Sequence, residues 1–525
     1  MRFFSTAGPV NCNDHYCLPP LTRFSLEEIL MLIDQKKYFV LHAPRQTGKT
    51  SCLLALMEYL NQKGRYRCLY FNAEIAQAAR ENIEQGMNNI LRELASRAQT
   101  HLGDHYPESI LPELLDGQAY GTALNQCLTK WAAVSDRPLV ILMDEIDALI
   151  GDTLISVLRQ IRAGYDKRPA QFPQSVVLCG VRDVRDYRIH SDREKSIITG
   201  GSAFNIKAKS LHLGNFDEKE IHVLLHEHVK ETGQTFDPDA EHLIWEYTQG
   251  QPWLVNALAY EVCFETEDDR DRSRPVNADM VIHAKENLIL RRETHLDQLA
   301  DKLREPRVRS VIEPIMTGTP EPEKMLEDDI QYVTDLGLIQ RKPQLRISNA
   351  IYREIIPRML TEATQDVMPF ETRWYVRPDG YLDMEKLLSA FQDFFREHSE
   401  HWIGRFDYRE AGPQLLLQAF LQRIINSGGR IDREYGLGRG RTDLMVIWKH
   451  QSGVQKVVIE LKILRKSMKA TIAEGVEQTS EYMDKCGTDF GNLIIFDRRP
   501  KRKWGAKIFK KEKYSGGKKI TVWGM

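Results

Sequence analysis

One short stretch near the N-terminus has the residue types and order that bind phosphate groups. Residues 43–50 read Ala-Pro-Arg-Gln-Thr-Gly-Lys-Thr. In a loop between a strand and a helix, backbone N–H groups at the helix's positive end can hold a polyphosphate. Gly48 lets the main chain come close, Lys49 supplies charge for the β- and γ-phosphates, and Thr50 offers a hydroxyl to Mg²⁺. Four neighbours are expected in the same nucleotide site: Pro44, Gln46, Thr47 and Ser51.

A second part of this site is predicted where an apolar run ends in two acids. Residues 139–143 are Leu-Val-Ile-Leu-Met, and Asp144 and Glu145 follow. Asp144 would hold Mg²⁺ through water, and Glu145 could orient or deprotonate the attacking water. The alternative is a buried strand capped by two solvated acids, but the phosphate loop favours the nucleotide interpretation. The loop departs from GxxxxGK[ST] at its first position, where Ala43 replaces glycine.

Another constellation near the C-terminus could cleave phosphodiester bonds. Side chains alternate along a strand, so Glu460 and Lys462 project from one face while Ile459 and Leu461 enter the core. Asp443 opens the preceding strand, and a hairpin can bring its carboxylate beside Glu460. The two acids would then bind Mg²⁺, and Lys462 would activate water or stabilise developing charge.

Gln478 and Tyr482 follow on a predicted helix and add to this site. They are four residues apart and therefore share one helical face. They can hydrogen-bond the water shell of the metal or a DNA backbone. The plain alternative for the whole constellation is a solvated strand that carries a Glu–Lys pair on one face.

The elements that must position these residues form two α/β patterns. The first, a doubly wound α/β pattern, has strands at 38–42, 67–72, 138–143 and 175–180, and helices at 51–60 and 79–100. The second has a helix at 412–425, strands at 430–435, 442–448 and 455–464, a helix at 470–485 and a strand at 492–497. Between them lie helices and a winged helix, with its second helix at 328–335 and wing strands at 338–340 and 345–347.

Bulk composition sets the broad class. A chain of 525 residues is too long for one core, so three or four domains are expected. The net charge of −2 gives no argument for nucleic acid, which must come from local charge. No apolar stretch could span a membrane and no signal peptide is visible, which predicts a cytoplasmic protein without a membrane partner. The eight cysteines form no CxxC pair, and reduced thiols are the simplest expectation.

The N-terminal motifs resemble the AAA+/STAND class of ATPases, in particular the prokaryotic AAA-like ATPases. The similar segments are residues 4–10 and 42–50. The resemblance implies ATP as the ligand, Arg182 as the arginine that senses the γ-phosphate, and Gly250-Gln251-Pro252 as the GxP motif whose Pro252 packs near the base. The alternatives are a surface salt bridge for Arg182 among its charged neighbours and a plain inter-helix turn for the GxP stretch.

The C-terminal constellation is similar to the PD-(D/E)xK nuclease superfamily, and the Gln478–Tyr482 pair to its RecB-like branch. The order of helix, three strands, helix and strand matches that superfamily's core. Many RecB-like members carry a glutamate on the first helix, whereas here Gln414 and Gln418 stand there and Glu410 precedes them. Either Glu410 supplies this acid or one ligand is missing.

The C-terminal tail is rich in lysine and arginine interleaved with aromatic residues, and it predicts a strip that neutralises DNA phosphates. We expect its aromatics to point inward and its lysines outward. The helix at 328–335 is acidic, which argues against reading of the major groove and favours packing on the ATPase.

Together these features predict an ATP-dependent switch that controls a fused Mg²⁺-dependent nuclease acting on DNA, with a prokaryotic defence or mobile-element role suggested by analogy. The rival is a STAND-like switch whose C-terminal domain only binds nucleic acid or a protein. Endo- or exonuclease action and a homo-oligomer stay open. The predicted fold class is a multi-domain α/β protein with these parts: a P-loop ATPase core at 1–214, a helical lid at 215–294, a winged helix at 295–360, a linker at 361–383 and a nuclease-like domain at 384–525.

Overall fold

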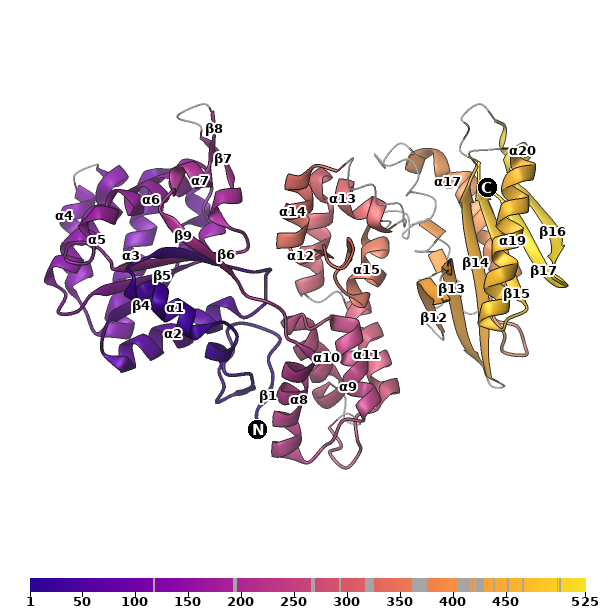
Figure 1. Ribbon diagram of the computed structural model, residues 1–525, viewed down its shortest axis with the longest axis horizontal. Helices are drawn as coiled ribbons and strands as arrows, with labels where there is room; N and C mark the ends of the chain where they lie inside the picture. Colours follow the sequence, from indigo (N-terminus) through magenta and orange to yellow (C-terminus); the bar gives the residue numbers. More distant parts are fainter. Residues whose placement is uncertain are drawn as a thin grey trace. The chain divides into compact units, whose positions relative to one another are not determined.

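The computed structural model divides the chain into two compact units (Figure 1). The first contains Met1–His295, Gln331–Arg341 and Ser348–Ala350, and the second contains Leu296–Ile330, Lys342–Ile347 and Ile351–Met525. The structure describes all residues except 117–118, 192–195, 266–269, 292–293, 317–324, 361–374, 404–415, 418–419, 422–428, 438–439, 451–452, 465–466, 498 and 500–501.

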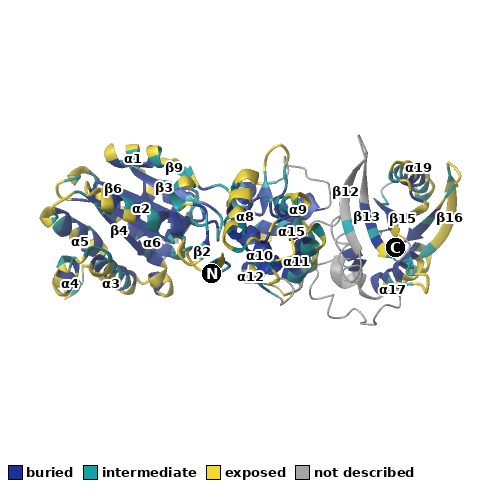
Figure 2. Cartoon of the chain, turned by 90° about the horizontal axis from the view of Figure 1, so that it is seen from below, coloured by how far each residue is buried: buried dark blue, intermediate teal, exposed yellow. Residues whose placement is uncertain are grey.

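A parallel five-stranded sheet forms the centre of the first unit. Its strand order is β4-β5-β6-β3-β9, and every neighbouring pair is parallel. The strands are β3 (Tyr38–His42), β4 (Arg67–Asn72), β5 (Leu139–Asp144), β6 (Ser175–Gly180) and β9 (Lys207–His212). Strands β5 and β6 are buried along their whole length, as expected where helices cover both faces of a parallel sheet (Figure 2).

Helices cover the two faces of this sheet. Alternate strand residues enter one of two apolar clusters, because successive side chains point to opposite faces. One cluster includes helices α1 (Leu26–Asp34) and α2 (Lys49–Lys63). The other includes α3 (Ile83–Leu102), α4 (Tyr106–Asp116), α5 (Tyr120–Val134) and α6 (Gly151–Ala163). The phosphate loop therefore lies between a buried strand and a helix that is packed along its length.

The predicted strands agree closely with the observed ones in this unit. Those at 38–42, 67–72 and 175–180 coincide with β3, β4 and β6, and β5 begins and ends one residue later than predicted. Strand β9 was not predicted, since Lys-Ala-Lys-Ser-Leu-His at a sheet edge has no apolar run. The helix expected at 79–100 begins later, at Ile83, because the side chain of Asn82 caps it by accepting from the Gln85 N–H.

Helices continue the chain after β9. They are α8 (Glu218–Thr232), α9 (Pro238–Thr248), α10 (Pro252–Phe264), α11 (Ala278–Arg291), α12 (Thr294–Leu303), α13 (Pro306–Met316), α14 (Glu327–Asp335) and α15 (Ala350–Leu360). Short strands β10 (Ile339–Gln340) and β11 (Arg346–Ile347) lie where wing strands were expected. The boundary between the two compact units falls within this stretch, and the finer domain boundaries stay predictions.

A mixed six-stranded sheet of order β12-β13-β14-β15-β17-β16 forms the second unit's core. The strands are β12 (Gly429–Leu437), β13 (Gly440–His450), β14 (Gly453–Ile463), β15 (Phe490–Phe496), β16 (Phe509–Ser515) and β17 (Lys518–Gly524). The first three form an antiparallel meander, and β15 then pairs parallel to β14 after the crossover helix α19 (Met468–Cys486). These elements follow the predicted order, but most of the helix expected at 412–425 lies outside the described residues.

Helices α19 and α17 (Met384–Ile403) pack on the sheet of the second unit. Val476 and Met483 of α19 join Val458, Leu493 and other strand residues in one apolar cluster. On α17, Phe395 contacts Phe496, and Gln392 donates to the backbone carbonyls of Phe509 and Gly524. The views place these helices on opposite faces of the sheet (Figure 2).

The C-terminal hairpin differs in part from the expectation that the aromatic side chains of the tail point inward and its lysines outward. Trp523 is buried and donates from its indole N–H to Asn492, as an inward aromatic should. Tyr514, however, is 69% exposed, because it lies on strand β16 at the sheet edge. Lys507 is buried, with its amine over the Trp504 ring, so it does not lie in the exposed basic strip.

Cysteine pairing also differs from the expectation. Cys12 and Cys17 form a disulfide, with their Cα atoms 5.6 Å apart, so the prediction of reduced thiols was wrong for this pair. The separation of five residues and the intervening turn bring the two side chains together. The other six cysteines are free, and five of them are buried.

No described helix is both long enough and apolar enough to cross a bilayer.

Candidate functional site

The loop after β3 has the backbone shape that a phosphate site needs. Gly48 caps helix α2 at φ 90°, and Gln46 also has a positive φ of 56°. The first N–H groups of α2 have no acceptor within the helix and are available to a ligand. Ala43 is not among the residues with positive φ, and its N–H donates to the Gly180 carbonyl at 3.2 Å. Alanine therefore replaces the usual glycine without backbone strain.

Lys49 is the charged group of this loop. Its side chain is almost fully buried, and its amine donates to the carbonyls of Ala43 and Pro44, each at 3.0 Å. The hydroxyl of Thr47 donates to the same Pro44 carbonyl at 2.8 Å. These bonds hold the ammonium over the loop, so the positive charge lies where the phosphate-binding N–H groups are.

Thr50 and Asp144 meet at the end of β5. The Thr50 hydroxyl donates to Asp144 Oδ2 at 2.7 Å, and Tyr70 donates to the same oxygen at 3.2 Å. Asp144 is fully buried, and its Oδ1 accepts from the Glu145 N–H at 2.9 Å. A hydroxyl and a carboxylate are the donor set that suits Mg²⁺, which keeps waters and phosphate oxygens as its other ligands. Among the described residues no three His, Cys, Asp or Glu side chains could hold a metal ion by themselves.

Glu145 follows directly in a left-handed conformation, with φ 51°. Burial, and after it the neighbouring charge of Asp147, raise the pKa of its carboxyl, Lys49 opposes them, and the net result is a pKa of about 7. A carboxyl that titrates near neutrality, next to a phosphate loop, is suited to accept a proton from water.

Arg182 contacts helix α14 as well as the nearby ring of Tyr187. Its Nε lies 3.2 Å from Asp335 Oδ2, and both side chains are largely buried. The guanidinium lies 4.8 Å from the ring centre of Tyr332, and Gln331 donates to the other Asp335 oxygen at 2.8 Å. The predicted sensor arginine is therefore held by the segment that ends α14, and the surface salt bridge considered as its alternative is not the contact seen.

Residues of two helices lie at the phosphate loop: His295 of α12 contacts Gln46, and Pro252 of α10 lines the pocket beside the loop. Gln46 hydrogen-bonds His295, whose ring stacks on Trp253 at 4.8 Å. Burial lowers the pKa of His295 to about 4, so this imidazole is neutral near pH 7. Pro252 begins α10 and lines a pocket beside the loop.

Gly250 fixes the turn that delivers Pro252 to this pocket. Its φ is 73°, and a Cβ there would lie 1.8 Å from the Phe216 carbonyl oxygen. Only glycine fits such a position. The Gly-x-Pro stretch is therefore a constrained turn between α9 and α10, held against the backbone of Phe216.

The pocket beside the loop includes residues that sequence reasoning did not identify. Ser51, expected to bind nucleotide, lines this pocket, and its hydroxyl oxygen accepts from the N–H of Val10 at 2.8 Å, which ties the N-terminal segment to α2. Arg23 was missed: it lines the pocket, donates to the Gly214 carbonyl at 2.6 Å, and places its guanidinium 4.4 Å from the Phe216 ring centre. No motif surrounds Arg23, and only tertiary contacts reveal it.

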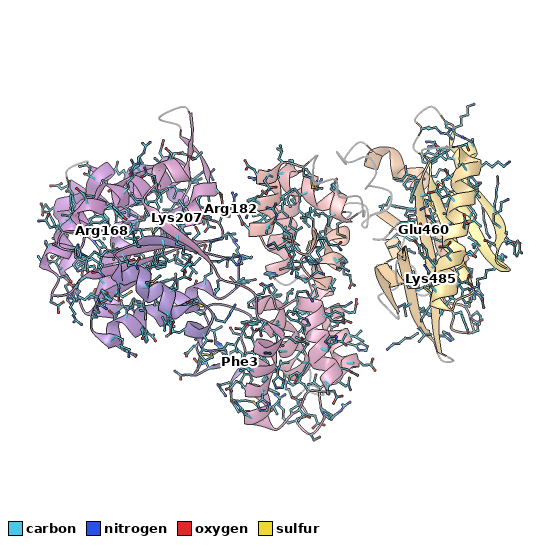
Figure 3. All side chains as sticks on the ribbon, viewed as in Figure 1. Phe3, Arg168, Arg182, Lys207, Glu460 and Lys485 are labelled. Carbon is cyan, nitrogen blue, oxygen red and sulfur yellow. A yellow bond between two sulfur atoms is a disulfide. The ribbon has the colours of Figure 1, made fainter. Side chains whose placement is uncertain are left out.

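The second constellation lies on β14 and α19. Glu460 is 4% exposed, and the Lys462 amine donates to its Oε1 at 2.8 Å (Figure 3). Both residues share a strand face with Val458, which packs against α19. On that helix Gln478 is half-buried, and its Oε1 has no hydrogen-bond partner among the described atoms. Tyr482 packs against the same apolar cluster.

Asp443 belongs to the neighbouring strand β13. It directly precedes Leu444, which pairs with Ile459, the residue before Glu460. The side chain of Asp443 lies outside the described part of the structure, as do Glu410, Gln414 and Gln418. The structure therefore brings together Glu460, Lys462 and the α19 face, and gives only the strand position of Asp443.

The fold and the first site define a class: an α/β protein of the P-loop NTPase type. No family model matches the chain, and no curated protein matches it significantly. Among solved structures it is similar to the Walker-type ATPase PABY2304 of Pyrococcus abyssi, at 15% identity and a TM-score of 0.47, covering 67% of this chain and 99% of that one. It is also similar to Cdc6p of Pyrobaculum aerophilum, at 12% identity and a TM-score of 0.38, covering 75% and 97%. These distant likenesses add no detail about substrate or partner.

Proposed function

We propose that the first unit binds ATP with Mg²⁺ and hydrolyses it. The observation that carries this proposal is the joint placement of the Lys49 amine over the loop and of the Thr50 hydroxyl against Asp144. A structural loop would not require a buried lysine whose amine is bound only to main-chain carbonyls next to a helix N-terminus.

The chemistry follows from these positions. The loop N–H groups and Lys49 hold the β- and γ-phosphates, and Thr50 and Asp144 would hold Mg²⁺, which when bound offsets phosphate charge. Glu145 accepts a proton from a water molecule, whose oxygen attacks the γ-phosphorus. The bond from this phosphorus to the β–γ bridging oxygen breaks, and ADP leaves with the electron pair.

The test of hydrolysis is its pH dependence. Glu145 acts as a base only when ionised, and its pKa is raised to about 7. At saturating ATP we expect the turnover rate to be nearly constant above pH 8 and to fall about tenfold per pH unit below pH 6. Glu145→Gln should lower the rate at least about 100-fold and still bind ATP. Glu74→Gln, an exposed acid on the first unit, is the control. A wild-type rate that is flat between pH 5.5 and 8.5 contradicts the assigned base.

We propose further that the Arg182–Asp335 pair restrains the nucleotide site. Arg182 stands two residues after β6, where an arginine could reach a γ-phosphate, but Asp335 holds it. Gly337 also lies against Pro44 of the phosphate loop. Nucleotide binding that recruits Arg182 must then break this pair, which links the site to the position of α14.

Asp335→Asn therefore should strengthen nucleotide binding. Because an uncharged partner holds Arg182 less tightly, we expect the affinity for a fluorescent ATP analogue to rise about tenfold, equivalent to about 1.4 kcal/mol. Asp328→Asn, on the exposed start of the same helix, should leave that affinity unchanged. An unchanged affinity in a folded Asp335→Asn protein would show that the pair does not restrain the site.

A second function is proposed for the second unit: Mg²⁺-dependent cleavage of DNA, controlled by the nucleotide state of the first. The specific support is the largely buried Glu460–Lys462 pair on the strand face that packs against α19, the helix that carries Gln478. Metal-dependent cleavage needs a carboxylate for the metal and a cation for developing charge, and these side chains supply both. The exposed lysines of β16 and β17 would contact DNA phosphates. In the rival proposal this unit binds nucleic acid or protein without cutting.

A further inference from the structure

The pocket beside the phosphate loop is built from distant parts of the first unit. Residues of the N-terminal segment, the loop and helix α10 line it together. Its apolar walls include Pro252, Trp253 and Phe216, and Trp253 donates from its indole to the Thr6 carbonyl at 2.8 Å. Such walls, next to a site for phosphates, suit the flat ring system of a base.

Asn256 gives this pocket a directed polar group. Its side chain is 7% exposed, and its Nδ2 donates to the Pro252 carbonyl one helical turn earlier at 2.8 Å. This bond fixes which way the amide points. The remaining Oδ1, an acceptor, is buried and has no hydrogen-bond partner within the described chain. A buried unsatisfied acceptor is costly, so a donor from a ligand is the natural partner.

We propose that Asn256 determines base specificity, by accepting a hydrogen bond from the exocyclic 6-amino group of an adenine. Guanine and hypoxanthine present a carbonyl oxygen at position 6, which would face the Asn256 acceptor and leave it unsatisfied. This inference rests on the proposed ATP site and names the nucleotide that the site selects.

The test compares purine nucleotides that differ at position 6, on the full-length protein; ITP also carries a proton on N1, and N6,N6-dimethyl-ATP does not. Competition against a fluorescent ATP analogue should show ITP, which carries oxygen there, binding at least tenfold more weakly than ATP. N6,N6-dimethyl-ATP, which has no N–H to donate, should bind as weakly as ITP. In Asn256→Leu, ATP affinity should fall about tenfold while ITP affinity changes less than about threefold, so the two converge.

Inorganic triphosphate reports the phosphate loop alone and serves as the internal control. Its affinity should be the same in wild type and Asn256→Leu, which also shows that the variant is folded. Equal affinity of the wild type for ATP, ITP and dimethyl-ATP would overturn the role of Asn256 and leave the phosphate site intact. If neither ATP nor triphosphate binds the wild type, the proposed ATP site itself has failed and this inference with it.

Discussion

Lys49→Met is expected to reduce ATP affinity at least about 100-fold. Charge-assisted hydrogen bonds from an ammonium to phosphate contribute about 1.5–3 kcal/mol each, and Lys49 is the lysine aimed at the loop. Methionine keeps the apolar stem that packs in this largely buried position, so the loss reports the charge rather than a cavity. The measurement is titration with a fluorescent ATP analogue at 0.15 M salt.

Lys63→Met provides the matched control. Lys63 ends the same helix α2, is exposed, and lies outside the pocket lining. Its replacement should change ATP affinity less than about twofold. If the Lys49 variant keeps wild-type affinity while remaining folded, residues 43–50 are not a phosphate loop, and the assignment of Thr50 and Asp144 loses its basis.

Lys462→Ala is expected to lower Mg²⁺-dependent DNA cleavage about 1000-fold and leave DNA binding nearly unchanged. Its amine lies 2.8 Å from Glu460 Oε1, and in the proposed nuclease it would offset charge in the transition state. The assay uses plasmid and single-stranded DNA with Mg²⁺, each with and without ATP, and measures both cleavage and binding.

Lys456→Ala is the control for this experiment, because Lys456 lies on the same strand β14 but is exposed. It should cleave like the wild type. A wild type that binds DNA tightly and cleaves neither form under any nucleotide condition would support the rival, in which the second unit only binds its partner.

The central strands of the first unit could be predicted because burial on both faces demands unbroken apolar runs. Residues 38–42 and 175–180 are such runs, and their ends position the phosphate loop and Arg182. Strand β9 could not be recognised, because Lys207 and Lys209 lie on this edge strand and it has no apolar run. Local pattern thus locates the strands that have an apolar run, including the edge strand β4, and misses the edge strand that lacks one.

The contacts that complete the site could not be predicted from the sequence, because they join segments that are far apart along the chain. Asp335 binds Arg182 across 153 positions, and Trp253 reaches Thr6 across 247. The acids of α14 were interpreted as an argument against DNA reading and for packing on the ATPase, but nothing local shows that the last one has a buried arginine partner. Arg23 was missed for the same reason: its role depends on the Phe216 ring and on carbonyls supplied by other segments.

The distance of Asp335 along the chain has a consequence for biosynthesis. Every residue that lines the pocket beside the phosphate loop lies between Ser5 and Asn256, whereas the carboxylate that restrains Arg182 lies 79 positions further on. At about 5–20 residues per second, a ribosome needs roughly 4–16 s to cover that interval. In the proposed mechanism, the residues of the nucleotide site are therefore synthesised before the carboxylate that restrains Arg182, so a nascent chain could bind nucleotide before the restraint is present.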